Sequence, residues 1–318
     1  MVKIVVIGGD AAGMSAASKA KRDDDSLDVT VFERGGWVSY GACGLPYYVK
    51  DEIEELDELV AVTPDEFVEE RGIDLRTRHE VTTIDADEKK VEVESDDGVF
   101  DEPYDKLVVA TGARALEPPI DGLDLDGVHT FRTMGAGEEV KQEFEDENPD
   151  SVGIVGGGYI GVEMAEAFRE RGAEVHVFEM LPHILAPFGE PVARVVEDHL
   201  RDEDVDIHLE TAVSEIAGED GEVSAVRTDE DEFPVDLVIV GAGVKPNVEI
   251  AEDAGVETGS TGAIATDEYG RTNLSDVYAA GDCAEAKNAV TGEPDHVPLA
   301  LTANRQGRAI GTTLAGEL

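Results

Sequence analysis

The chain has 318 residues, of which 73 are Asp or Glu and 25 are Lys or Arg, giving a formal net charge of −48 at pH 7. This charge argues against nucleic acid as a partner. Because the acidic residues are spread along the chain, they indicate a halophilic protein, adapted to salt that screens charges within roughly 3 Å at molar concentration. The length favours two domains over one core.

The sequence also indicates a cytoplasmic protein. No apolar run is long enough to span a membrane, and the N-terminus enters a strand without a signal-peptide pattern. Cys43 and Cys283 lie far apart, which argues against a disulfide framework and fits a reducing compartment. No set of metal ligands is indicated.

The first elements predict a dinucleotide-binding βαβ unit, with strands over residues 3–7 and 29–33 and a helix over residues 14–22. Gly8 permits the tight turn, Gly13 lets helix and strand pack closely, and the helix N-terminus suits a pyrophosphate. Glu33 stands where an acid binds a ribose hydroxyl, the alternative being a solvated carboxylate. Asp10 takes the place of the usual second glycine.

The segment Ser39 to Tyr48 contains the cysteine best placed for chemistry, Cys43. Gly41 and Gly44 allow the backbone to bend and approach a ligand closely. If Cys43 opens a helix, unpaired amide groups lower its pKa and favour the nucleophilic thiolate. The alternative is a small buried apolar residue, which is how most free cysteines behave.

The remainder of the first domain is predicted as a helix over residues 56–71, strands that form an antiparallel layer, and a return to the main sheet. The predicted strands cover residues 74–77, 81–85, 90–94 and 107–110. Thr111 and Gly112 then form a turn at a strand end, and the segment 116–122, rich in Pro and Gly, reads as a linker.

A second glycine loop repeats the plan with Gly156, Gly158 and Gly161 at full spacing. Its helix runs to about Arg171, and Glu179 follows the next strand at residues 174–178. No Lys or Arg follows closely to hold a 2′-phosphate, which favours NADH over NADPH. Two such loops in one chain predict two dinucleotides.

Further strands are predicted at residues 207–209, 223–227 and 237–240, followed by the turn at Gly243. Asp282 then ends an apolar strand, where its carboxylate binds a sugar-chain hydroxyl or caps the next helix. Cys283 has no assigned role and is expected to be a buried residue at a strand end.

The two glycine loops, Asp282 and Cys43 together carry a resemblance to a known family. Along essentially its whole length, the chain resembles the FAD- and NAD(P)H-dependent pyridine nucleotide-disulfide oxidoreductases. The segment around Cys43 is similar to the single-cysteine branch, which contains coenzyme A-disulfide reductase, CoA-dependent NAD(P)H sulfur reductase, NADH oxidase and NADH peroxidase. Glutathione-reductase relatives carry two cysteines at this point, whereas no second cysteine follows Gly44 here.

The resemblance implies an α/β fold with two Rossmann-like domains arranged as in glutathione reductase. The expected FAD-binding domain comprises residues 1–115 and 246–318, and the NAD(P)H-binding domain comprises residues 116–245. Relatives are homodimers that continue into a C-terminal dimerisation domain, which this sequence lacks. The chain is therefore expected to be a piece of a longer protein or a short member.

The resemblance also implies a role for each matching residue. The FAD contacts would be Gly8, Gly13, Glu33, Thr111, Gly112 and Asp282. The NADH contacts would be Gly156, Gly158, Gly161, Glu163, Glu179 and Gly243, with Glu163 near the nicotinamide. The channel for coenzyme A would be lined by Ser15, Lys19, Arg22, Ser39, Arg71 and Asn304.

Lys19 and Arg22 suit phosphates on physical grounds, because they share one helix face at i and i+3 in a very acidic chain. The alternative is a solvated helix face. Two residues depart from the family pattern. Ala11 stands where the peroxidases and water-forming oxidases carry His, and Ala42 replaces a frequent Asn before the cysteine.

The predicted function is electron transfer from NAD(P)H through FAD and Cys43 to CoA disulfide or a CoA-linked persulfide or polysulfide. CoA is either substrate or partner in a mixed disulfide with Cys43. One alternative is an NADH oxidase in which Cys43 cycles through a sulfenate. Another is a flavin-bound interaction or sensor protein without useful turnover.

Overall fold

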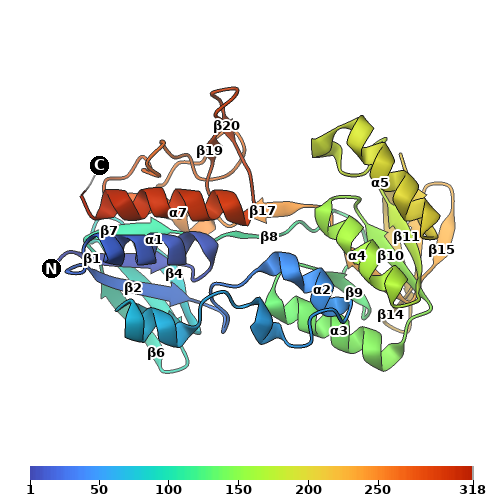
Figure 1. Ribbon diagram of the computed structural model, residues 1–318, viewed down its shortest axis with the longest axis horizontal. Helices are drawn as coiled ribbons and strands as arrows, with labels where there is room; N and C mark the ends of the chain where they lie inside the picture. The colour runs from blue at the N-terminus through green and yellow to red at the C-terminus, as the bar shows by residue number, and fades with distance from the viewer. Residues whose placement is uncertain (317–318) are drawn as a thin grey trace. The chain divides into compact units, whose positions relative to one another are not determined.

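The computed structural model describes residues 1–316 and divides into two compact units (Figure 1). Unit 1 comprises residues 1–41, 60–114 and the chain from residue 245 onward, and unit 2 comprises residues 42–59 and 115–244. The connecting segments β8 (Ala113–Ala115) and β17 (Val244–Pro246) pair with each other. Within the described residues, no helix is both long enough and apolar enough to cross a bilayer.

Unit 1 is built on a five-stranded sheet in the order β18-β7-β1-β2-β3, with every pair parallel. Its strands are β1 (Lys3–Ile7), β2 (Asp28–Glu33), β3 (Asp74–Thr77), β7 (Lys106–Val109) and β18 (Val277–Ala279). Ile4 and Val6 face the helices, whereas Val5 and Ile7 face an antiparallel layer. Both faces are buried, which explains why β1 is apolar at successive positions.

The antiparallel layer consists of β4 (His79–Asp85), β5 (Lys90–Ser95) and β6 (Gly98–Pro103). The opposite face is covered by α1 (Ala11–Asp23) and α7 (Ala300–Leu314), which pack against each other. A Cβ at Gly307 would collide with the Ala12 carbonyl, and one at Gly311 would crowd Ala16. The two helices therefore approach closely because α7 carries glycine at these positions.

The remaining helices and strands of unit 1 are short. These are the π-helical turn η3 (Glu66–Glu70), α6 (Glu249–Asp253), and the pair β19 (Ala286–Lys287) and β20 (Pro294–Asp295).

Unit 2 repeats the plan with a parallel sheet in the order β12-β11-β10-β16-β9. Its strands are β9 (Val128–Thr130), β10 (Ser151–Val155), β11 (Glu174–Phe178), β12 (Val205–His208) and β16 (Leu237–Val240). Its main helices are α3 (Met134–Glu147), α4 (Tyr159–Glu170) and α5 (Glu190–Asp202), and a short η4 (Ala186–Phe188) precedes α5. An antiparallel layer of β13 (Val213–Glu219), β14 (Glu222–Thr228) and β15 (Glu232–Pro234) packs against the sheet. The predicted pair of Rossmann-like sheets is confirmed.

The continuous helix predicted over residues 56–71 is wrong. The structure has a 3-10 turn η2 (Leu56–Leu59) and then η3, and the chain between them contains a β-bridge at Val60 and a bend at residues 61–62. The Ala61 N–H donates to the Ser39 carbonyl (2.8 Å), and Val60 forms a bridge with Tyr40. Pro64 disfavours a helical conformation at the residue before it, so the chain is free to make this pairing.

The segment 42–59 groups with unit 2, whereas the sequence expectation placed it in the first domain. It contains η1 (Ala42–Gly44) and α2 (Leu45–Val49), and α2 packs against α3 and α4. Lys50, only 9% exposed, lies within 2.8–3.1 Å of Glu52, Glu166 and Glu170, which together raise the pKa of its ammonium group.

Basic side chains of α3 and the end of α4 also hold this segment. Arg171 donates to the Val49 carbonyl (2.8 Å), and Lys141 pairs with Asp51. These contacts join residues that are far apart in sequence. They explain why the local sequence pattern does not show that residues 42–59 belong to unit 2.

Candidate active site

The two glycine loops have matching geometry. Gly8 (φ +109°) donates its N–H to the Phe32 carbonyl at 2.8 Å, and Gly156 (φ +110°) does the same to Phe178 at 2.8 Å. A Cβ at Gly13 would collide with the Gly8 carbonyl, and one at Gly161 with the Gly156 carbonyl. Each loop thus turns sharply into its helix in a way that only glycine permits.

The two loops differ at their middle position. A Cβ added at Gly158 would meet no protein atom within 4 Å, and the backbone there is extended (φ −77°, ψ −168°). No packing within the protein therefore requires glycine at Gly158, which leaves room for a ligand to approach the backbone. At the same place in the first loop, the Asp10 side chain accepts from the Tyr40 N–H (3.2 Å). The departure from the glycine pattern thus has a structural role, as Asp10 holds the segment that leads to Cys43.

The acids that follow each loop are held identically. Glu33 accepts from the N–H groups of Gly9 (2.8 Å) and Gly35 (2.7 Å). Glu179 accepts from those of Gly157 (2.8 Å) and Leu181 (2.8 Å). A carboxylate offers about four acceptor sites, so two such bonds fix its position and leave capacity for ribose hydroxyls. These features fit a dinucleotide at each loop.

The other residues assigned to FAD lie in unit 1 at strand ends. Thr111 donates through Oγ1 to the Asn247 carbonyl (2.6 Å), and the Asn247 N–H donates to Gly112 (3.0 Å). Asp282 follows β18, where its carbonyl accepts from His296 Nε2 (2.9 Å). Gly243, assigned to NADH, has φ +114° and accepts from the Leu116 N–H (2.9 Å) in unit 2.

Glu163 is half-buried in the first turns of α4. Burial raises the pKa of its carboxyl group, and the nearby Glu166 raises it further. The folded chain therefore binds a proton at Glu163 more tightly than the unfolded chain does. The charged carboxylate costs stability at neutral pH, and this cost disappears as the pH falls below the ordinary value.

Replacing Glu163 with glutamine is expected to raise the unfolding temperature at pH 7–8 by less than about 3 °C, since half-exposed charges are partly screened. The difference from the parent should shrink towards pH 5. Thermal unfolding of the parent and of Glu163→Gln across this pH range measures the difference. A difference that grows on acidification would contradict the burial argument.

The two cysteines occupy opposite environments. Cys43 is exposed in η1, and α2 begins two residues later at Leu45. Its exposure excludes the alternative of a buried apolar residue. Cys283 is fully buried, burial raises the pKa of its thiol, and its Sγ lies 3.3 Å from the Ala280 carbonyl oxygen. The expectation that Cys283 is buried is confirmed.

A hollow of about 670 Å³ in unit 1 brings together all the residues assigned to the CoA channel. They are Ser15, Lys19, Arg22, Ser39, Arg71 and Asn304. Ser15 donates to Asn304 Oδ1 (2.6 Å), which joins α1 to α7. Ser39 has a left-handed backbone (φ +49°) and donates its N–H to the Gly9 carbonyl (3.0 Å).

The residues of this hollow that sequence reasoning missed include Ser18, Phe67 and Arg308. Arg71 Nη1 donates to Ser18 Oγ (3.1 Å), and its guanidinium lies 4.8 Å from the centre of the Phe67 ring. Arg308 follows Asn304 by one helical turn, a spacing that predicts the same face once Asn304 is assigned.

Four cations therefore surround the hollow in a strongly acidic protein: Lys19, Arg22, Arg71 and Arg308. Lys19 pairs with Asp23, and Arg71 pairs with Glu66. Among the described residues, Arg22 and Arg308 are exposed and form no ion pair. The hollow can thus bind an anion with several phosphate groups.

Comparisons with known proteins agree with this geometry. Residues 2–307 match the family of pyridine nucleotide-disulphide oxidoreductases. A CoA-dependent NAD(P)H sulfur oxidoreductase of Pyrococcus abyssi is 42% identical over 315 residues, covering 99% of this chain and 70% of the relative. An NADH oxidase of Methanocaldococcus jannaschii is 35% identical over 317 residues, with the same shares of 99% and 70%.

Among solved structures, an NAD-dependent persulfide reductase from A. fulgidus has a TM-score of 0.94 and 40% identity. The match covers 99% of this chain and 59% of that one. The chain belongs to the pyridine nucleotide-disulphide oxidoreductase family, whose cofactors are FAD and NAD(P)H. The predicted resemblance to this family is confirmed.

Proposed function

We propose that this chain carries electrons from NAD(P)H through FAD and Cys43 to CoA disulfide or to a CoA-linked persulfide or polysulfide. The observation that carries the proposal is the hollow in unit 1, where four basic side chains and four uncharged polar side chains meet. Unit 1 would bind FAD, and unit 2 would bind the nicotinamide dinucleotide, through the loop and acid residues assigned above.

The hollow suits coenzyme A because this molecule has phosphates at one end and a thiol at the other. Guanidinium groups bind phosphate through paired N–H donors, which favours Arg22, Arg71 and Arg308 for this role. Ser39 lines the hollow, and Cys43 follows it by four residues. The chain therefore keeps the two within about 14 Å, the span of four extended residues.

Cys43 would act as the nucleophile, since the thiolate of an exposed cysteine can attack a disulfide. Its Sγ forms a bond to one sulfur of CoA disulfide, and the other CoA leaves as a thiolate. FAD bound in unit 1 would supply the two electrons, received from NAD(P)H, that return the mixed disulfide to the Cys43 thiolate and a second CoA thiolate. A single cysteine suffices because CoA supplies the other sulfur.

The second candidate is an NADH oxidase, favoured by the 35% identity to the Methanocaldococcus protein of that name. Ala11, which lines the hollow, stands where peroxidases and water-forming oxidases carry histidine, and this counts against peroxide as the main substrate.

The experiment that separates the two candidates measures NADH consumption by the FAD-loaded chain under two conditions. In the first, CoA disulfide is present under argon. In the second, air is present without CoA disulfide. We expect faster consumption in the first, with CoA thiol formed at two per NADH. Consumption in air alone would support the oxidase, and slow flavin reduction in both would support a sensor protein.

Glu179 is expected to select NADH over NADPH. Its carboxylate is fixed by the Gly157 and Leu181 N–H groups, where it would repel a 2′-phosphate. Replacing Glu179 with glutamine removes this repulsion and keeps much of the hydrogen bonding. The ratio of kcat/KM for NADPH to that for NADH should rise at least about tenfold.

Glu174→Gln is the matched control for Glu179→Gln, because Glu174 begins β11, away from the loop, whereas Glu179 directly follows the end of β11. An unchanged ratio in Glu179→Gln would show that another group sets the preference.

We further propose that the chain works in the salt-rich cytoplasm of a halophile. The net charge of −48 supports this, because such repulsion opposes a compact state unless salt screens it. The unfolding temperature should rise by roughly 10 °C or more between dilute and molar KCl. A sugar at equal osmolarity is the control, and an unfolding temperature independent of KCl would contradict the proposal.

A further inference from the structure

Two histidines and two carboxylates cluster on one face of adjacent strands in unit 2. Glu174 and His176 lie on β11, and Asp206 and His208 lie on β12. The parallel register places His176 opposite Asp206, and His208 opposite Phe178. Val175 and Val177 are fully buried on the other face, so alternation along the strands gathers the polar side chains on one side.

The separations between ligand atoms suit a shared metal ion. His176 Nδ1 lies 3.2 Å from His208 Nε2 and 3.8 Å from Asp206 Oδ2. Ligands bound at 2.0–2.1 Å in a tetrahedral arrangement are about 3.3 Å apart. Glu174, His176 and Asp206 each offer one ligand atom within 4.8 Å of the other two, and His208 lies beside the same imidazole. Side-chain movement would bring His176, His208 and Asp206 onto one ion.

Glu174 lies on the opposite side of the same imidazole. Its Oε1 is 3.4 Å from His176 Nε2, whereas Nδ1 faces His208 and Asp206. A carboxylate beside one ring nitrogen favours the tautomer with its proton there, which leaves the other nitrogen bare to bind metal. Glu174 is therefore placed to orient the ligand.

Aromatic packing holds both rings. His208 stacks on Phe178, with centroids 4.9 Å apart and planes 13° apart, and lies 4.5 Å from Phe233. His176 stacks on His208 at 5.5 Å. Ring contacts therefore hold the two imidazoles beside each other on this face of the sheet.

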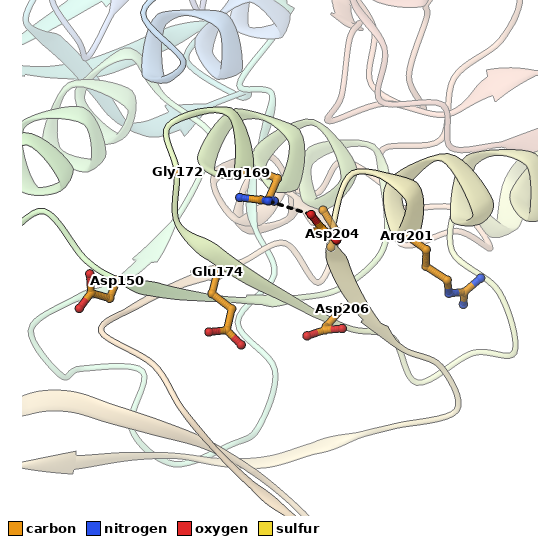
Figure 2. Close-up of a pocket in the computed structure, with 8 residues that line it drawn as sticks. Asp150, Arg169, Gly172, Glu174, Arg201, Asp204 and Asp206 are labelled. Atoms are coloured by element: carbon orange, nitrogen blue, oxygen red, sulfur yellow. Dashed lines mark hydrogen bonds and ion pairs between the residues drawn. The ribbon is translucent and has the colours of Figure 1, made fainter.

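A hollow of about 520 Å³ lies beside the cluster and is lined by its two carboxylates, Glu174 and Asp206. Figure 2 shows the carboxylates of Glu174 and Asp206 on its wall, near that of Asp150. Arg169 in the same wall is paired with Asp204 (3.2 Å). The carboxylates outnumber the two arginines that line the hollow, so its wall favours entry of a cation.

We propose that His176, His208 and Asp206 bind one divalent transition-metal ion of the zinc class, with Glu174 orienting His176. Imidazole ligands favour such ions over Mg²⁺ or Ca²⁺. The ion would tie β11 to β12 near the end of β11 that leads to Glu179. Sequence spacing gave no metal prediction because the ligands alternate along two strands and contain no cysteine.

The test is equilibrium dialysis of the FAD-loaded chain against Zn²⁺ in molar KCl with excess Mg²⁺, which suppresses weak binding to surface carboxylates. All variants carry Cys43→Ser, because the exposed Cys43 thiol would also bind zinc. We expect one tight equivalent per chain. His176→Gln should not bind this tight equivalent of Zn²⁺, and Glu174→Gln should weaken the affinity for Zn²⁺ about 10-fold to 100-fold.

His199→Gln, which changes an exposed histidine on α5, is the control and should retain the full equivalent. If His176→Gln fails to fold, Asp206→Asn replaces it, because Asp206 is exposed. Copper(II) in place of zinc should show hyperfine coupling to two imidazole nitrogens by electron paramagnetic resonance. Zinc binding unchanged in His176→Gln and Asp206→Asn, or no saturation at one equivalent, would overturn the proposal.

Discussion

Replacing Cys43 with serine is expected to lower the turnover of CoA disulfide at least about a thousandfold while NADH still reduces the flavin. Serine keeps the size of the side chain but cannot form the mixed disulfide. Stopped-flow absorbance under argon follows flavin reduction, and thiol release follows turnover. The two measurements separate the chemistry at sulfur from the binding of both cofactors.

Cys283→Ala is the matched control for this experiment. Cys283 is buried with its thiol directed at backbone carbonyls, so its loss should leave turnover nearly unchanged. Persistent turnover in Cys43→Ser would show that Cys43 is not the nucleophile. Loss of flavin reduction in the same variant would point to damaged cofactor binding.

Replacing Gly158 with alanine is expected to raise the KM for NADH at least about tenfold without changing the unfolding temperature. The added methyl group would meet no protein atom within 4 Å, and the local backbone suits any residue. It would occupy the space through which a pyrophosphate approaches the loop. The flavin should remain bound, because the first loop lies in unit 1.

Gly135→Ala is the control for the effect of an added methyl group in unit 2. Gly135 lies within α3, and a Cβ there also meets nothing within 4 Å. This variant should keep the parent KM and gain up to about 1 kcal/mol of stability, because alanine favours a helix. An unchanged KM in Gly158→Ala would remove the second loop from the NADH site.

Sequence reasoning located the elements whose pattern is local. The strands at residues 3–7, 74–77, 174–178 and 237–240 have the predicted bounds. Residues 3–7 and 237–240 are the clearest cases, since apolar runs between turns identify buried strands. The acids Glu33 and Glu179 were found from their spacing alone. Their identical bonds to the loop backbone explain why the spacing recurs.

Features that depend on distant contacts were missed. Asp10 reads as a lost glycine in sequence, but its carboxylate binds the Tyr40 N–H across 30 residues. The continuous helix expected over residues 56–71 does not form, because the Ala61 N–H donates to the distant Ser39 carbonyl instead of to a carbonyl within a helix. Arg308 joins the basic hollow only because α7 packs on α1.

The discontinuity of unit 1 has a consequence for biosynthesis. Its parallel sheet is incomplete until β18 is made, and α1 lacks its partner until α7 emerges from the ribosome. Most of unit 2 is one continuous stretch, residues 115–244, that is translated earlier. Because long-range contacts form late, the nascent chain should complete the second Rossmann-like core first, and the first core should stay incomplete until β18 and α7 have been synthesised.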